Sequence, residues 1–500
     1  GDDVPIDYFT ESRFGVAVSA PRIAEGLELA PGTRPGEPIE TSYLIFLDDF
    51  FSIKRDRDIV IDDLIEQVSA LGPEDQVAVV AFDGLDLEML TSWTGSVDEV
   101  HDVLEEAKER RANGLQRVAE QLRFDDSYQV ASLSEVLRLD DRQVNLDTYL
   151  TPEERFFASM LAGQVQRAVQ AATATLRGFA SPPGRKVMLL ASGGWPFLPA
   201  EFVVSDFRRP VFDERVPGGS ELFSPLTETA NRLGYTIYSI DIPGMDRSVV
   251  DPRAELARPQ LGRGRAPAVF DSRTRLGQQG GFVREQEVHY SLQYVAEQTG
   301  GKALLNSARR EAFQTAREDT RTYYWLGFTP QWQGDDTYHD IEIELTDPSL
   351  RVRSREGYMD LSRQLETSMT VESALLFGAP PPSDSPLKLV FGRPEKAGRK
   401  KMNVPLRVDI PLEEVVFLPT GEGSRQARLE LRVAVVDSQG AQAEIPVIPL
   451  FIDGAREPEP GSVFSYDVSL KMRRERHRAV VAVYDQASGK MLSGTAEINP

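Results

Sequence analysis

Residues 43–52 read YLIFLDDFFS, an apolar run of strand length that ends in two consecutive aspartates, Asp48 and Asp49. A continuous apolar run of this length is typical of a strand that is buried on both faces of a parallel sheet. Open α/β sheets bind their ligands in the crevice beyond the carboxyl ends of the strands. The stretch therefore predicts a parallel sheet that carries two carboxylates at its functional edge.

The residues after this strand leave three interpretations of the edge open. In the first, Asp48, Asp49 and the hydroxyl of Ser52 hold a weakly bound divalent cation, Mg²⁺ or Ca²⁺, through oxygen ligands, although Phe50 stands where a third oxygen is wanted. In the second, no cofactor is bound, and the aspartates cap the next helix and hydrogen-bond the loop. In the third, the edge is a metal-free contact surface on which Phe50 and Phe51 form an apolar patch.

The composition limits the classes of partner. The 500 residues include 56 basic and 78 acidic side chains, which gives a net charge of −22 and makes nucleic acid and anionic membranes poor partners. There is no cysteine, so disulfides, thiolate metal sites and a cysteine nucleophile are excluded. No apolar run reaches the length of a membrane span. The chain starts at Gly1 without a signal-peptide pattern, which fits either a processed or a trimmed N-terminus.

The first 320 residues predict an N-terminal strand and linker, followed by a doubly wound α/β domain. Residues 1–41 hold the strand and a Pro- and Gly-rich linker, and strands then alternate with helices from 42 to 320. The expected strands are 43–47, 76–82, 186–191, 236–240 and 302–305, and the expected helices include 97–123, 221–233, 289–299 and 309–319. Thr151-Pro152-Glu153-Glu154 has the pattern of a capping box that opens a further helix.

Two segments read as insertions in this domain. Residues 110–150 are polar from position 124 onward, and residues 243–287 combine glycine, proline and glutamine with many arginines. Loops of such length in a compact domain are functional or disordered. An arginine-bearing loop in an acidic protein is a candidate for docking on a partner.

The periodicity changes to that of β structure after residue 320. Segment 321–378 shows period-two alternation and is predicted to be a β-rich extension of the first domain, and 379–386 is a Pro-rich linker. Residues 387–500 contain six short strand candidates, between 387 and 484, that are separated by turn residues. This spacing predicts an antiparallel β-sandwich of the immunoglobulin or fibronectin III kind.

Several motifs together resemble a known family. The strand that ends at Asp48, the strand QVAVVAF (76–82) and the stretch KVMLLASGG (186–194) resemble a von Willebrand factor A (VWA) domain. The segments TGG (299–301), YYWLGFTP (323–330) and RVRSREGY (351–358) are similar to the VWFA-related proteins of Acidobacteria and neighbouring phyla. The resemblance covers about residues 42–360 and implies a doubly wound, mostly parallel, Rossmann-like sheet.

The resemblance also implies a site and a role. VWA domains carry a metal-ion-dependent adhesion site whose first loop has the motif DxSxS, here Asp48, Phe50 and Ser52. A third loop supplies an aspartate, and Ser192 stands at that position here, so the implied site is degenerate. Thr151 and Ser159 are the candidates for the threonine of the second loop.

The role implied is that of a bacterial, non-enzymatic, extracytoplasmic module for adhesion or protein–protein interaction, a scaffold or subunit of a larger complex. Its protein partner is not identified by the sequence, and Phe50, Phe51 and Ser192 are the candidate contact residues. The alternative is a hydrolase that uses Asp48, Asp49 and Ser192 at the edge of the sheet. The hydrolase hypothesis predicts a closed pocket with perturbed carboxylates, and a flat or loop-covered edge would argue against it.

Overall fold

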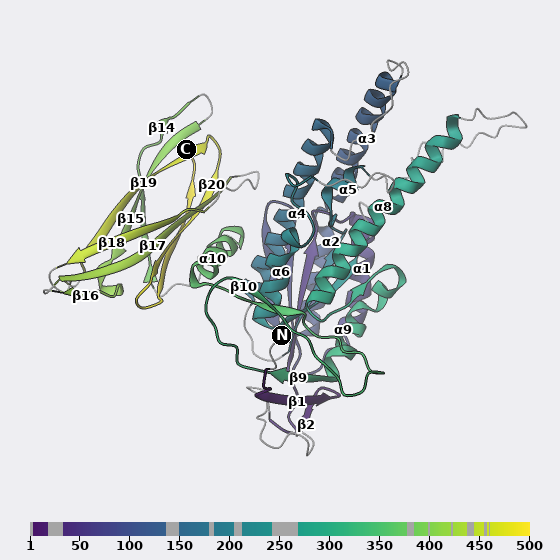
Figure 1. Cartoon of the computed structure of the whole chain (residues 1–500), viewed down its shortest axis with the longest axis horizontal. Coiled ribbons are helices and arrows are strands. Elements are labelled where there is room, and N and C mark those ends of the chain that lie inside the picture. Colours follow the sequence, from purple (N-terminus) through teal and green to yellow (C-terminus); the bar gives the residue numbers. More distant parts are fainter. Residues whose placement is uncertain are drawn as a thin grey trace, which may run out of the picture. The chain divides into compact units, whose positions relative to one another are not determined.

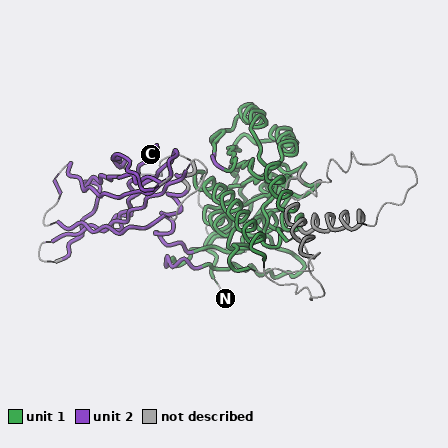
Figure 2. Tube along the Cα trace, turned by 90° about the horizontal axis from the view of Figure 1, so that it is seen from above, with its two compact units in different colours: residues 1–84, 88–332, 338–359 green, residues 85–87, 333–337, 360–500 purple. Residues whose placement is uncertain are grey.

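The computed structural model divides into two compact units, which Figure 2 distinguishes by colour. The first unit comprises residues 1–84, 88–332 and 338–359, and the second comprises 85–87, 333–337 and 360–500. The residues that the structure describes are 4–18, 34–136, 150–179, 185–204, 213–242, 269–377, 385–398, 401–421, 424–437, 445–454, 458–459 and 461–500. The division at 359/360 falls inside the segment 321–378 that the sequence groups as one extension.

A six-stranded sheet forms the centre of the first unit (Figure 1). In spatial order its strands are β5 (Leu87–Thr94), β4 (Gln76–Phe82), β3 (Thr41–Asp48), β6 (Arg185–Ser192), β7 (Tyr235–Asp241) and β8 (Ala303–Leu304). β3 pairs in parallel with both β4 and β6, and β7 pairs in parallel with β6 and β8. The strands predicted from the apolar runs are confirmed.

Both faces of this sheet are covered. All eight residues of β3 are buried, although successive side chains point to opposite faces. On one face Tyr43, Ile45 and Leu47 share a hydrophobic cluster with side chains of α1 (Lys54–Val68), α2 (Val97–Glu109) and α9 (Ala312–Arg321). Burial on both sides is the reason that the strand reads as a continuous apolar run.

The remaining described helices of the first unit include α4 (Pro152–Gly178), whose N-terminal capping box was predicted from the sequence. The others are α3 (Gly114–Val136), α5 (Pro199–Val204), α6 (Ser220–Leu233) and α8 (Val269–Gln298), with a 3₁₀ segment at Asn306–Glu311. At the N-terminus of α4 the Thr151 hydroxyl accepts the Glu154 N–H, and the Glu154 carboxylate accepts the Thr151 N–H. The predicted capping box is confirmed.

The two predicted insertions are more helical than expected. α3 continues to Val136, past the predicted helix end at 123 and into the segment that reads as polar in the sequence. α8 starts at Val269, inside the predicted loop, because a helix extends cooperatively from a packed segment, here Val288 to Ala296. Residues 137–149 and 243–268 lie outside the described residues.

Short sheets accompany the first unit. β1 (Tyr8–Arg13) pairs antiparallel with β2 (Val16–Val18) and with β9 (Tyr323–Gly327). β10 (Thr337–Asp340) and β11 (Gly357–Asp360) form a two-stranded sheet. The single strand predicted within residues 1–41 is present as two strands, and β1 pairs with the YYWLG segment (323–327).

The second unit contains two mostly antiparallel sheets. One is built from β12 (Ser385–Pro386), β21 (Met491–Ile498), β20 (His477–Asp485), β17 (Ser424–Asp437) and β16 (Leu418–Gly421), with β18 (Val447–Gly454) also paired to β17. The other is built from β13 (Lys388–Phe391), β15 (Lys401–Pro411), β14 (Glu395–Lys396) and β19 (Val463–Arg473). Side chains from both sheets share one hydrophobic cluster. β21 was not predicted.

The segment 321–378, which the sequence predicts to be β-rich, contains β9, β10 and β11 but ends in a helix, α10 (Arg363–Phe377). Val371 and Leu375 of this helix pack on Ala434 and Val480 of the second unit. The buried guanidinium of Arg432 donates to the Ser368 hydroxyl. The face of α10 that makes these contacts is short and weakly apolar, so the sequence of this helix shows little helical periodicity.

The chain is therefore a mixed α/β protein with parallel strands in one unit and antiparallel sheets in the other, as the coarse prediction states. Among the described residues, no helix is long and apolar enough to cross a membrane.

Candidate functional site

The candidate site lies where three parallel strands end. β3, β6 and β7 are neighbours and finish at Asp48, Ser192 and Asp241, all at the carboxyl edge of the sheet. The loops that follow β3 and β6 touch there: a Cβ on Gly193 would lie 2.1 Å from the Phe51 carbonyl oxygen. The absence of a side chain at Gly193 permits this approach, which brings Ser192 beside Asp48.

The carboxylate of Asp48 is fully buried and accepts four hydrogen bonds. Oδ1 accepts the backbone N–H groups of Phe50 at 3.0 Å and Phe51 at 3.2 Å. Oδ2 accepts the Ser192 hydroxyl at 2.6 Å and the Trp195 indole N–H at 2.8 Å. Both oxygens of the predicted metal ligand are thus engaged by donors of the protein.

The protonation of Asp48 reflects its burial. Removal from water raises the pKa of Asp48 to about 6, and the four hydrogen bonds act in the opposite direction because they favour the charged form. The carboxylate is therefore ionised at neutral pH and needs its donors. Ser192 in turn accepts the Gly194 N–H at 3.1 Å, so its hydroxyl links the strand end to the loop.

Asp49 is neutralised by two arginines. Its Oδ1 lies 2.5 Å from Nη1 of Arg57, and its Oδ2 lies 3.0 Å from Nε of Arg110. Asp49 and Arg57 are both fully buried. Arg57 also donates from Nη2 to Asp58 at 2.7 Å and to the Lys108 carbonyl at 3.1 Å. This guanidinium supplies positive charge at the same strand end at which a cation was predicted.

The donor set does not fit a bound divalent cation. Mg²⁺ and Ca²⁺ require free carboxylate or carbonyl oxygens, and the oxygens of Asp48 and Asp49 already accept hydrogen bonds. The Ser52 hydroxyl is buried and has no hydrogen-bond partner among the described residues. Thr151, a candidate second-loop ligand, caps α4 instead. One hydroxyl does not make a metal site.

The predicted apolar contact patch is corrected by the structure. Phe51 is fully buried and Phe50 is only 5% exposed. The ring of Phe50 packs against Gly84, where a Cβ would lie 2.2 Å away, and the guanidinium of Arg117 lies 4.7 Å from the ring centroid. Ser192 is also fully buried. The rings of Phe50 and Phe51 face the protein interior and do not form an exposed contact surface, because the loop folds back over the end of β3.

Sequence reasoning missed Trp195 and Arg57. Arg57 carried a signal, since it falls at helical spacing with Val60, Ile61 and Leu64 on the buried side of α1. A charged residue on an apolar helix face needs a buried partner. Trp195 follows the glycines of the SGG motif, but its spacing from Asp48 has no sequence pattern, so only the fold brings the two together.

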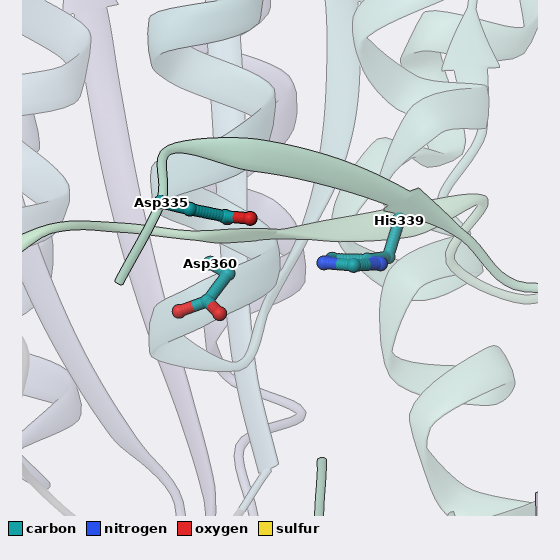
Figure 3. Close-up of side chains that lie close together, drawn as sticks. All are labelled: Asp335, His339 and Asp360. Atoms are coloured by element: carbon teal, nitrogen blue, oxygen red, sulfur yellow. The ribbon is translucent and has the colours of Figure 1, made fainter. Parts of the chain in front are cut away.

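Among the described residues, two further groups of acidic and histidine side chains lie close enough together to hold a metal ion: Asp335, His339 and Asp360, and Asp437, Glu475 and His477. Figure 3 shows Asp335, His339 and Asp360, which lie close together. The two oxygens of Asp360 accept backbone N–H groups from Gln333 at 2.5 Å and Gly334 at 3.0 Å. These bonds hold a turn, and the acidic side chains are used for it.

The unpaired hydroxyl gives a first prediction. We expect Ser52→Ala to leave the free energy of unfolding unchanged or to raise it by up to about 1 kcal/mol, because it removes a buried polar atom that has no partner. Ser192→Ala, which removes a donor to Asp48, is the matched comparison and should lower stability by about 1–3 kcal/mol. Chemical denaturation of the two variants measures both values. A large loss for Ser52→Ala would show that its hydroxyl has a ligand.

Comparison with known proteins gives no assignment. No family model matches the chain, and no curated protein matches it. Among solved structures, the TFIIH p34 N-terminal domain is similar at 12% identity, with 56% of this chain and 97% of that chain covered and a TM-score of 0.20. A beta-glucuronidase from glycoside hydrolase family 2 is similar at 11% identity, with 22% and 11% covered and a TM-score of 0.17.

A putative beta-galactosidase from Bacteroides fragilis is similar at 10% identity, with 22% of this chain and 16% of that chain covered and a TM-score of 0.16. The chain thus spans only 11% to 16% of the length of these two glycosidases. Similarity at this level supports no argument about fold or function.

Proposed function

We propose that this chain is a metal-free protein-interaction module, built from a VWA domain with a degenerate adhesion site and a C-terminal β-sandwich. In this proposal it is a non-enzymatic scaffold or complex subunit that binds a protein partner. The extracytoplasmic location is part of the proposal and rests on the family-like motifs alone.

The strand order supports the VWA assignment. Parallel strands run outward on both sides of β3, so the order reverses beside that strand, which is the arrangement of a doubly wound sheet. The DxSxS-like loop follows β3 directly, at the carboxyl edge. The two C-terminal sheets with one shared core support the β-sandwich.

The observation that carries the metal-free assignment is the indole N–H of Trp195 on Asp48. A cation at this carboxylate would have to replace a fully buried tryptophan and the serine hydroxyl beside it. The neighbouring Asp49 holds Arg57 at 2.5 Å, which supplies the positive charge internally. The carboxylate oxygens of Asp48 and Asp49, to which a bridging metal ion would bind, are therefore already engaged by donors of the chain.

The test is titration of chelator-treated protein with Mg²⁺, Mn²⁺ and Ca²⁺, followed by calorimetry and by melting temperature. We expect neither heat of binding nor a rise in melting temperature up to about 1 mM metal, because an ion that binds only the native state must stabilise it. The control is Ser52→Ala, which removes the buried Ser52 hydroxyl that has no partner among the described residues. Tight binding that is lost in this variant would restore the metal-dependent site.

The hydrolase alternative has a direct check. Asp48, Asp49 and Ser192 are each fully buried and hydrogen-bonded, whereas a nucleophilic serine must be reached by substrate. We expect no adduct on Ser192 after treatment with a fluorophosphonate, as read by mass spectrometry. A labelled Ser192 would favour the enzyme.

A further inference from the structure

The edges of the two C-terminal sheets differ in how they are protected. Edge strands expose unpaired N–H and C=O groups, and proteins block them with short strands, prolines or charges. β18 contains Pro449, β16 contains Pro419 and β12 contains Pro386. β13 has four residues and β14 has two. Each of these strands carries a feature that discourages a further strand from pairing with it.

β19 is neither short nor interrupted by a proline, although it carries charged side chains. It runs for 11 residues without a proline and pairs with β15 along its whole length, from Val463 opposite Pro411 to Arg473 opposite Lys401, without a shift of register. In the part of the chain that the structure describes, no strand pairs with its other edge. β19 is therefore a long, regular and open edge.

The direction of the backbone groups on β19 follows from its neighbours. The Pro405 carbonyl accepts the Gly392 N–H on the β13 side of β15. Because backbone groups alternate in direction along a strand, the N–H and C=O groups of Val404 and Leu406 point to the other side, toward β19. Their partners on β19 are Leu470 and Val468. The even-numbered residues of β19 thus bond β15, and the odd-numbered residues direct their N–H and C=O groups to the open edge.

The side chains alternate in the same way. Phe464, Tyr466, Val468 and Leu470 pack against the hydrophobic cluster of the two sheets. The exposed positions are Ser465, Asp467, Ser469, Lys471 and Arg473. Two opposite charges, Asp467 and Lys471, therefore flank Ser469 symmetrically on the outer face.

We propose that β19 is a self-association edge, at which two copies of the chain pair antiparallel β19 strands about a two-fold axis at Ser469. In this register Asp467 of each copy faces Lys471 of the other, and odd-numbered residues face each other, as the backbone directions require. An axis at Val468 would instead place Asp467 opposite Ser469 and form no ion pair. Cross-strand pairs of opposite charge stabilise antiparallel strands, and a two-fold interface must be self-complementary.

The charged group of Asp467 is already positioned for this contact. Its carboxylate accepts two hydrogen bonds from Arg407 on β15, at 2.9 Å and 3.3 Å. The side chain is held on the outer face of the sheet, so it loses less conformational freedom on pairing. Because one strand pair forms a small interface, the dimer is expected to dissociate on dilution.

The test is sedimentation velocity of the full chain at about 5 to 200 µM in about 0.15 M salt, where surface charges are only partly screened. We expect a concentration-dependent dimer. Asp467→Lys presents only cations at the two facing positions, and Lys471→Asp presents only carboxylates. Each variant alone should raise the dimer dissociation constant at least about tenfold through like-charge repulsion, whereas an equimolar mixture of the two should dimerise again.

Two controls separate this result from misfolding and from net charge. Asp453→Lys makes the same charge change on β18, whose edge carries Pro449, and should leave dimerisation unchanged. The melting temperature of each variant should stay within a few degrees of the parent, since exposed ion pairs contribute little. A parent chain that stays monomeric at 200 µM, or a mixture that fails to recover the dimer, would overturn the proposal.

Discussion

Replacement of Asp48 by asparagine should destabilise the protein by about 3 kcal/mol, although the two side chains have nearly the same shape. An amide has one oxygen for the two N–H groups of Phe50 and Phe51, and its nitrogen then faces the Trp195 N–H. Two donors that face each other in the interior lose a hydrogen bond and leave both groups unsatisfied. Urea denaturation of the variant measures the loss.

A double-mutant cycle isolates this contact. Trp195→Phe removes the indole donor and by itself costs stability through lost packing and a lost hydrogen bond. In the Asp48→Asn background the same change should cost about 1–2 kcal/mol less, because the donor that it removes is already unsatisfied. Equal costs in the two backgrounds would mean that the indole contributes nothing to holding the carboxylate.

The same variant has a signature in pH. The pKa of Asp48 is raised by burial to about 6 in the folded state, and an unfolded aspartate titrates near about 3.9. The folded state binds the proton of Asp48 more tightly than the unfolded state does. Protonation of Asp48 therefore raises the free energy of unfolding below about pH 4, and this gain is lost as the pH rises to about 6. The stability difference between the parent and Asp48→Asn should therefore shrink across that interval, by up to about 3 kcal/mol.

Replacement of Arg57 by methionine should cost about 3–5 kcal/mol, because it leaves the fully buried Asp49 with Arg110 as its remaining described cation. Arg55→Met is the matched control: Arg55 is exposed on the same helix, and its replacement should change stability by less than about 0.5 kcal/mol. Both values come from chemical denaturation.

A second substitution identifies the cause of the loss. If the unpaired carboxylate is responsible, Asp49→Asn should be strongly destabilising in the parent but should recover part of the stability in the Arg57→Met background. A further loss in the double variant would assign the cost to packing of the arginine side chain and not to its charge.

Local pattern was sufficient for the central sheet but not for the helices that surround it. β3 and β4 were predictable because all residues of β3, and all residues of β4 after Gln76, are buried. α3 was not predicted beyond residue 123, because the sequence reads as polar from residue 124 onward. α10 packs through a few small and aliphatic side chains, so the β pattern before it dominated the prediction.

The site was predictable in its location and not in its chemistry. The end of an apolar strand places Asp48 at the carboxyl edge, and this follows from local sequence. Two of its four donors, the Ser192 hydroxyl and the Trp195 indole, are 144 and 147 residues further along the chain, and their approach depends on the contact between Gly193 and Phe51. Distances of that kind arise from tertiary packing, which no short motif encodes.

The internal donors at Asp48 and Asp49 also constrain how this chain can evolve. Ser192→Asp, the one change that would restore the acidic residue of a metal site, would place a second carboxylate where a hydroxyl now lies 2.6 Å from Asp48. Two carboxylates at that separation repel unless a cation lies between them, and the Trp195 indole N–H already donates to the same oxygen of Asp48. In the proposed metal-free module, Ser192→Asp alone is therefore expected to lower stability, and a cation site would need a further change at Trp195.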